Sequence, residues 1–367
     1  MPAALLRLAI HALSGCEEMK IFTCPTCNGA LYFDNLTCAC GTSVTFDPEA
    51  EAFRSGCETC ANREQIACNW QADAGAGSLC RACAMTEVVP DSLVHQNIPL
   101  WADTEKAKRW ALVNLGQWGW LKSADPGPRP RFHLLSEQTS AGRAAVTMGH
   151  DDGLITINVT EADPAQRVAR REDLSERYRT LIGHFRHELG HYVFLRLSQD
   201  QTFQNAFRAK FGDERADYGA ALARHYEQGP PQGWQQNHVT AYASSHPHED
   251  WAESFAHIVH LTDMLDSFVA AGFASPALNR LSTPPYQLRD AQALLSAGVE
   301  IGLGLNHTNR SMGLFDVYPF VLSETARDKL AFVHGAIRGG APETRTRSKG
   351  TGRRFWNLFR PGPVTPS

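Results

Sequence analysis

Three absences in the 367-residue sequence narrow what the protein can be. No apolar run reaches about 18 residues, so no transmembrane helix is expected. Lys and Arg (35) are fewer than Asp and Glu (39), and the net charge of −4 excludes a global basic field for nucleic acid. No cysteine follows Cys83, and nine of the ten cysteines lie between Cys24 and Cys83. Almost all of the cysteine chemistry of the protein is therefore confined to this short segment.

The spacing of the first cysteines favours a metal site over disulfide bonds. Cys24-Pro-Thr-Cys27 has the C-x-x-C spacing that a tetrahedral zinc site uses and that a disulfide framework does not need. Cys38-Ala-Cys40 is one residue short of that spacing, and we interpret the two pairs as the knuckles of a zinc ribbon. Because zinc–thiolate sites prefer a reducing compartment, the sequence favours a cytoplasmic protein.

A second set of cysteines follows the first. Cys80-Arg-Ala-Cys83 is a further C-x-x-C pair, and its partner pair is either Cys60 with Cys68 or Cys57 with Cys60. One or two structural zinc ions are therefore expected in the cysteine-rich segment. Its seven acidic residues against three basic ones disfavour phosphate binding, so this segment is better suited to a protein partner than to nucleic acid.

Composition divides the chain into four expected parts: an N-terminal extension (1–18), a zinc-ribbon module (19–90), a helical domain (91–337) and a basic disordered tail (338–367). Leu13-Ser-Gly-Cys16 resembles a lipoprotein cleavage box, but Arg7 and His11 interrupt the apolar residues before it. We therefore do not expect the N-terminal extension to be an export signal. An alternative for the tail is contact of Phe355-Trp-Asn-Leu-Phe359 with an anionic membrane or a partner.

Periodic patterns in the helical domain predict a mainly helical α+β fold. Apolar residues recur at spacings of three and four from Glu176 to Leu197, which indicates the strongest helix. β-branched residues predict a strand over 153–159. We also expect a strand over 131–136 and helices over 104–115, 214–226 and 247–270.

The strongest predicted helix contains the sequence His187-Glu188-Leu-Gly-His191. A spacing of four places both imidazoles on one face, one turn apart, where they can bind one ion. Glu188 lies about 100° round the helix from His187 and suits a general base acting on zinc-bound water. These three residues therefore predict a catalytic zinc ion held by His187 and His191.

A catalytic zinc needs a third protein ligand, and the helix over 247–270 offers it. Glu249 and Glu253 lie one turn apart on a shared face. We predict Glu249 as the ligand and Glu253 as the acceptor for the free N–H of a zinc histidine, with the reversed roles as the alternative. Tyr242, seven residues before Glu249, is either an oxyanion donor or a structural tyrosine.

Neighbouring polar residues receive structural interpretations. His184 is expected to be structural. Asp213 and Glu214 are expected to begin the helix over 214–226, where acidic residues complement the helix dipole. Asp217 could alternatively support a metal ligand.

The motif His187-Glu-Leu-Gly-His191 together with Glu249-Asp-Trp-Ala-Glu253 resembles the gluzincin pattern of the anthrax lethal factor catalytic domain, which also has a tyrosine at the place of Tyr242. From Met19 to about Ala270 the chain resembles a bacterial family of zinc-binding metallopeptidases with an N-terminal zinc ribbon. The phrases that carry this resemblance are Tyr178-Arg-Thr-Leu-Ile-Gly-His-Phe-Arg-His-Glu, Phe211-Gly-Asp-Glu-Arg-Ala-Asp-Tyr and His246-Pro-His-Glu-Asp-Trp-Ala-Glu. The resemblance implies a zincin-like peptidase fold over 91–337 and favours Cys60 with Cys68 as the second ribbon's first pair.

Together these patterns predict a zinc-dependent metallopeptidase that acts on a peptide or protein substrate. Glu188 activates the water, and Tyr242 helps to hold the oxyanion. The alternative is a non-catalytic zinc-binding protein whose ribbons mediate protein or nucleic-acid contacts.

Overall fold

The computed structural model describes residues 21–167 and 180–340. The extension over 1–18, the tail beyond Gly340 and the first residues of the helix expected from Glu176 lie outside the described residues. Within them, helices and small sheets combine in an α+β fold, which confirms the predicted fold class. No helix in the described ranges is long and apolar enough to cross a membrane.

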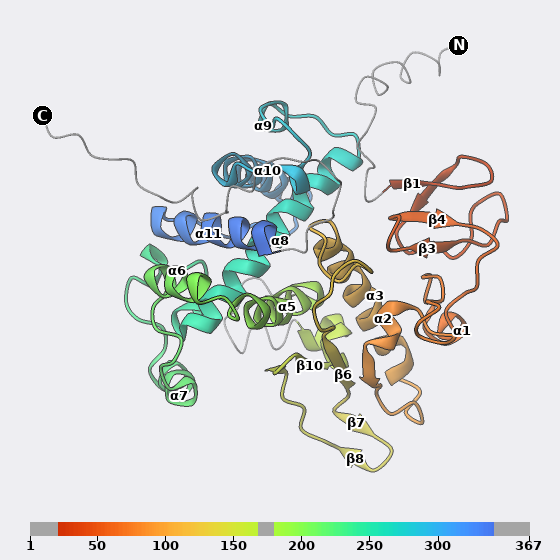
Figure 1. Ribbon diagram of the computed structural model, residues 1–367, viewed down its shortest axis with the longest axis horizontal. Helices are drawn as coiled ribbons and strands as arrows, with labels where there is room; N and C mark the ends of the chain where they lie inside the picture. Colours follow the sequence, from red (N-terminus) through yellow and green to blue (C-terminus); the bar gives the residue numbers. More distant parts are fainter. Residues whose placement is uncertain (1–20, 168–179, 341–367) are drawn as a thin grey trace, which may run out of the picture.

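The cysteine-rich segment folds into two antiparallel hairpins and two single-turn helices (Figure 1). These elements are β1 (Ile21–Thr23), β2 (Ala30–Tyr32), β3 (Thr45–Asp47), β4 (Ala52–Arg54), α1 (Arg63–Ile66) and α2 (Arg81–Ala84). Phe22, Phe46 and Phe53 pack edge to face at 5.3 to 5.6 Å between the hairpins. This aromatic cluster is the ribbon module's part of a hydrophobic core that continues into the helices.

A four-stranded sheet joins the ribbon module to the rest of the chain. Its order is β5 (Thr86–Val88), β6 (Arg131–Leu135), β10 (Leu154–Asn158) and β9 (Gly149–Asp151). β5, β6 and β10 are parallel, and β9 pairs with β10 in the antiparallel direction. The two strands predicted from sequence are thus confirmed. β5 lies before residue 90, so the predicted ribbon module contributes a strand to this sheet.

Buried apolar side chains at every second residue explain why β6 and β10 form the centre of the sheet. Phe132 and Leu134 of β6 and Ile155 and Ile157 of β10 are fully buried, each two residues from the next. A separate small hairpin, β7 (Gln138–Thr139) and β8 (Gly142–Arg143), extends from the loop after β6 (Figure 1).

Eight longer or shorter α-helices in the described residues beyond the ribbon module form the bulk of the fold: α3 (Asn97–Gly116), α5 (Leu181–Leu197), α6 (Gln201–Phe211), α7 (Tyr218–Gln228), α8 (Pro247–Ala270), α9 (Pro276–Asn279), α10 (Ala291–Ser311) and α11 (Glu324–Gly340). Short 3-10 turns lie between them, namely η1 (Val159–Ala162), η2 (Trp234–Gln236), η3 (Tyr242–Ser244) and η4 (Pro285–Gln287). α8 has the predicted bounds. α11 continues to Gly340, so the first three residues of the predicted tail are helical.

The predicted start of α7 was wrong by four residues. Asp217 caps the helix, because its side chain accepts a hydrogen bond from the Ala220 N–H at 2.9 Å. Glu214 instead pairs with Arg208 in the last turn of α6, and Asp213 pairs with Arg215. Asp213 and Glu214 therefore serve local turns rather than the helix dipole.

α5 crosses α8 at the centre of the molecule, and Gly190 sets the distance between them (Figure 1). A Cβ atom at Gly190 would lie 3.1 Å from both Ala252 and Phe255 of α8. The Trp251 indole N–H donates to the Gly190 carbonyl at 2.8 Å. A larger residue at position 190 would push the two helices apart, and these are the helices that carry the predicted ligands.

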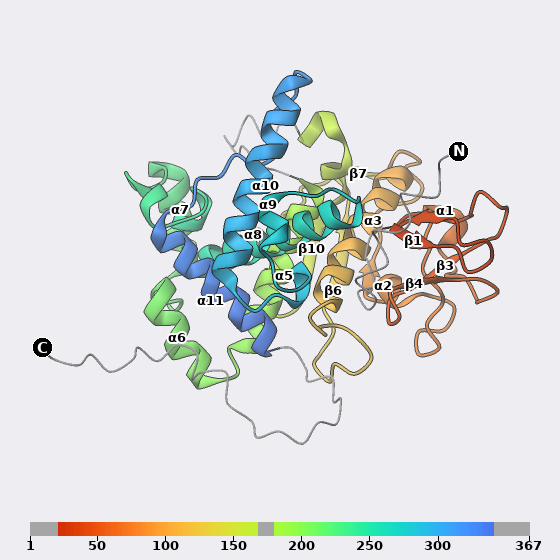
Figure 2. The same cartoon turned by 90° about the horizontal axis from the view of Figure 1, so that it is seen from above.

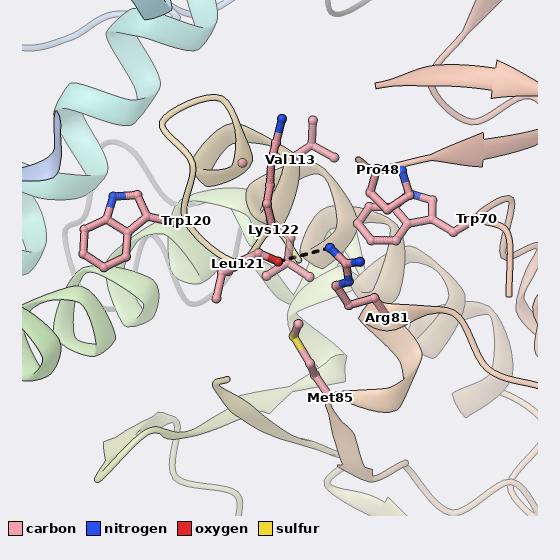
Figure 3. Close-up of a pocket in the computed structure, with 10 residues that line it drawn as sticks. Pro48, Trp70, Arg81, Met85, Val113, Trp120, Leu121 and Lys122 are labelled. Atoms are coloured by element: carbon pink, nitrogen blue, oxygen red, sulfur yellow. Dashed lines mark hydrogen bonds between the residues drawn. The ribbon is translucent and has the colours of Figure 1, made fainter. Parts of the chain in front are cut away.

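The ribbon module packs against α3, which lies between it and the other helices in both views (Figures 1 and 2). Phe33 contacts Trp110 edge to face at 4.8 Å, and Lys106 pairs with Asp34 at 2.7 Å. Figure 3 shows a small pocket at this junction, where the Arg81 guanidinium donates to the Leu121 carbonyl at 3.3 Å. The module is therefore held by both apolar and ionic contacts.

Candidate metal centre

Three predicted ligands converge where α5 crosses α8. The His187 and His191 Nε2 atoms lie 3.2 Å apart. Glu249 Oε2 lies 3.0 Å from His187 Nε2, and Glu249 Oε1 lies 3.5 Å from His191 Nε2. The histidines meet because α5 places them one turn apart, and Glu249 reaches them from the first turn of α8.

The surroundings of these atoms suit a cation. The His187 Nδ1 is 2.7 Å from Glu253 Oε1, so an N–H at Nδ1 leaves the lone pair of Nε2 directed at Glu249. Glu253 is itself oriented by the Thr240 hydroxyl, which donates to Oε2 at 2.8 Å. Glu249 Oε2 is buried and has no hydrogen-bond partner. Two nitrogen atoms and one carboxylate oxygen match the donor set that zinc sites with an open position use.

Glu249 remains an anion in this environment. Burial alone would raise the pKa of its carboxyl, yet the adjoining His187 and His191 imidazoles hold that pKa well below its ordinary value. The side chain is only 1% exposed. A buried carboxylate beside two imidazoles is therefore available to bind a metal ion.

Glu188 lies beside the three ligands without belonging to them. It is 8% exposed, and its Oε2 atom is buried without a hydrogen-bond partner. Its negative charge also raises the pKa of Tyr218, after burial and the charge of Glu249, so the two side chains share one environment. An unpaired buried carboxylate oxygen at this place can accept a proton.

Tyr242 lies on η3 with its ring centroid 6.1 Å from that of His187. Burial first, and then the negative charge of Glu249, raises the pKa of its hydroxyl. The phenol therefore remains protonated at neutral pH and can donate a hydrogen bond.

Besides Thr240, Tyr218 and His150 lie at the site and were not predicted. The Tyr218 hydroxyl donates to Glu249 Oε1 at 2.7 Å. The ring of His150, on β9, stacks on His191 at 5.9 Å, and its Nε2 accepts from the Gly153 N–H at 3.0 Å. Burial, and then His191, lowers the pKa of His150 to about 4. The cap at Asp217 is the signal that could have placed Tyr218 at the start of a helix, whereas nothing in the sequence near His150 points to the site.

The structure brings the cysteines together in two groups of four. The first contains Cys24, Cys27, Cys38 and Cys40, and the second contains Cys60, Cys68, Cys80 and Cys83. Within each group all four sulfur atoms lie within 4.8 Å of one another. Cys57 is exposed and lies outside both groups, so it is Cys60 and Cys68 that lie beside Cys80 and Cys83 in the structure.

Buried cations adjoin the second cysteine group. Arg109 is 2% exposed, and its Nε and Nη1 atoms have no hydrogen-bond partner. Burial would lower the pKa of this guanidinium, but the negative charge of its neighbours, Cys68 first and then Glu105, raises it. Lys108 is fully buried and pairs with Glu105 at 2.8 Å. Four thiolates around a zinc ion carry net negative charge, which Arg109 would offset.

Two four-cysteine groups and a crossed helix pair that bears two histidines and a glutamate lie within one α+β fold. This combination is typical of metal-binding proteins. Comparison with known proteins gives the family. The model of the family described as "Putative zinc-binding metallo-peptidase" matches residues 97–336, and the chain belongs to this family.

Two relatives of this chain are similar to it over a longer stretch than the family model covers, which includes part of the ribbon module. Uncharacterized proteins of Mycobacterium tuberculosis (strain H37Rv) and Mycobacterium bovis are each 37% identical over 339 residues, which cover 89% of this chain and 97% of the relative. No solved structure matches the chain.

Proposed function

We propose that the protein is a zinc-dependent peptidase that hydrolyses peptide bonds at the site formed by His187, His191 and Glu249. One observation carries this proposal: three buried or half-buried donor atoms converge, while Glu253 engages the far nitrogen of His187. Such an arrangement directs the Nε2 lone pair of His187 at the position where His191 Nε2 and a carboxylate oxygen of Glu249 also meet.

The side chains around that position have the roles that hydrolysis needs. A bound zinc ion supplies Lewis acidity, which polarises a carbonyl group and acidifies water. Glu188 accepts the proton of the attacking water and passes it to the leaving amine. Its buried, unpaired oxygen has no competing hydrogen bond to give up. Tyr242 donates its hydroxyl to the carbonyl oxygen as negative charge develops there.

β9 offers a place for an extended peptide. It is at one end of the four-stranded sheet, and no other strand in the described ranges pairs with its far side. Main-chain groups on such an edge can bind a peptide as an added strand. His150 of β9 stacks on His191, so a peptide bound along this edge would pass the proposed metal position.

The test compares three forms of the full-length protein for hydrolysis and metal content. Glu188→Gln should retain the zinc of the wild type and lose hydrolysis of a proteome-derived peptide library by at least about 100-fold, because a general base contributes that much. His187→Ala should lose one zinc ion. Mass spectrometry of new peptide termini and elemental analysis give the two readouts. If no cleavage depends on Glu188 while metal is bound, the protein is instead a non-catalytic zinc-binding module.

A further inference from the structure

Tyr218 distinguishes the two oxygen atoms of Glu249. Its hydroxyl donates to Oε1 at 2.7 Å, whereas Oε2 is buried, has no hydrogen-bond partner and faces His187 Nε2 at 3.0 Å. We propose that Tyr218 is a positioning residue, which holds Oε1 so that Glu249 binds the metal through Oε2 alone. This inference rests on the metal site of the proposed function.

The physical argument concerns the denticity of a carboxylate. A carboxylate can bind a metal through one oxygen or through both. A phenol at neutral pH donates one hydrogen bond and carries no charge, so it occupies one oxygen without neutralising the ligand. With one lone pair of Oε1 occupied by the Tyr218 hydrogen bond, Oε2 is the oxygen of Glu249 that keeps both of its lone pairs for the ion. Single-oxygen binding keeps the low coordination number of a site with an open position.

Contacts of His246 hold the start of α7 against the start of α8, and they keep the Tyr218 hydroxyl within hydrogen-bond distance of Glu249. His246 caps α8, because its Nδ1 accepts from the His248 N–H at 3.1 Å. The same ring places Nε2 at 3.1 Å from the Ala216 carbonyl, two residues before Tyr218. The Tyr218 ring packs edge-on against His246 at 5.2 Å. One histidine thus orients both the helix that carries Glu249 and the helix that carries Tyr218.

The rest of α7 contributes little to this placement. Ala221 is the buried residue of the helix, and Tyr218 is 43% exposed. Tyr226, at the other end of the same helix, is 66% exposed and is a matched control for the loss of a phenol hydroxyl. The contacts with Glu249 and His246 therefore position Tyr218.

The experiment measures metal binding rather than hydrolysis. Zinc is removed from the full-length protein with graded chelator, and the zinc that depends on His187 is quantified by comparison with His187→Ala. Tyr218→Phe should weaken the apparent affinity for this zinc by about 10- to 100-fold, as loss of a hydrogen bond to a ligand does. Tyr226→Phe should leave it unchanged. Tyr218→Ala provides the same test if the phenylalanine variant does not fold.

Cobalt(II) supplies a second readout at the same position. It is added after removal of the His187-dependent zinc, and the spectrum of His187→Ala treated in the same way is subtracted. Tyr218→Phe should weaken the visible absorption, because binding through both oxygens raises the coordination number. Wild-type affinity and spectrum in this variant would overturn the inference alone. Equal metal content in wild type and His187→Ala would overturn it together with the proposed function.

Discussion

The two four-cysteine groups differ in their exposure and in what they support. In the first group Cys27 and Cys40 are exposed, and the cysteines lie beside the hairpins of the ribbon module. In the second group all four cysteines are buried, and Arg109 of α3 adjoins them. The first group therefore lies at the edge of the hydrophobic core, with Cys24 and Cys38 buried in it, whereas the second group lies wholly inside that core. Similar ligand sets thus serve different parts of the fold.

The second group is also connected to the sheet below the candidate metal centre. Cys83 lies on α2, and β5 begins three residues later at Thr86. The Phe132 N–H of β6 donates to the Met85 carbonyl at 2.8 Å. A change in the second group should therefore reach the sheet, while a change in the first should remain in the ribbon.

The largest expected effect comes from removing a ligand of the second group. Cys68→Ser should release one zinc ion and lower the free energy of unfolding by an amount on the order of 4–5 kcal/mol, because the metal contributes to folding. Urea unfolding and elemental analysis give both quantities. The exposed Cys57, outside both groups, is the control: Cys57→Ser should change neither. A stable Cys68→Ser variant would remove the distinction between the two groups.

A smaller effect is expected at Arg109. Arg109→Met removes the buried positive charge beside the second group, and its loss should cost about 3 kcal/mol, since an uncompensated buried charge remains. The exposed Arg54 in the ribbon module provides the matched variant, Arg54→Met, for which no comparable change is expected. Equal stability of the two variants, measured by denaturant unfolding, would show that the thiolates need no counter-charge.

The smallest effect is expected at the first group. Chelator should remove its zinc in an early kinetic phase, because two of its sulfur atoms are accessible to solvent. Cys40→Ser should abolish this phase and lower the free energy of unfolding by only about 1 kcal/mol. Absorbance of a zinc indicator follows the release. A single phase, or a loss as large as that of Cys68→Ser, would contradict the comparison.

The sequence predicted those parts of the site that depend on local spacing. His187 and His191 share a face through helical geometry alone, and the same geometry pairs Glu249 with Glu253. Their convergence across two helices was predicted because a catalytic zinc needs a third ligand. The β-branched residues over 153–159 likewise predicted β10, and a strand expected over 131–136 is β6.

The remaining contacts depend on tertiary structure. Tyr218 reaches Glu249 from a helix with one buried residue, so no apolar period marks it. Its helix was predicted to begin at Glu214, because acidic residues favour a first turn, but the cap at Asp217 determined the start. His150 lies on a three-residue strand, too short for alternation to be recognised.

β5 has a practical consequence for any attempt to isolate the family-matched part of the chain. A protein trimmed to start at Asn97, where that match begins, would lose the strand that pairs with β6. The backbone edge of β6 would then be bare, and bare edges recruit other chains. Such a fragment is expected to aggregate. A soluble fragment should begin before Thr86 and include the whole second cysteine group, so the ribbon behaves as part of the domain's scaffold rather than as a removable appendage.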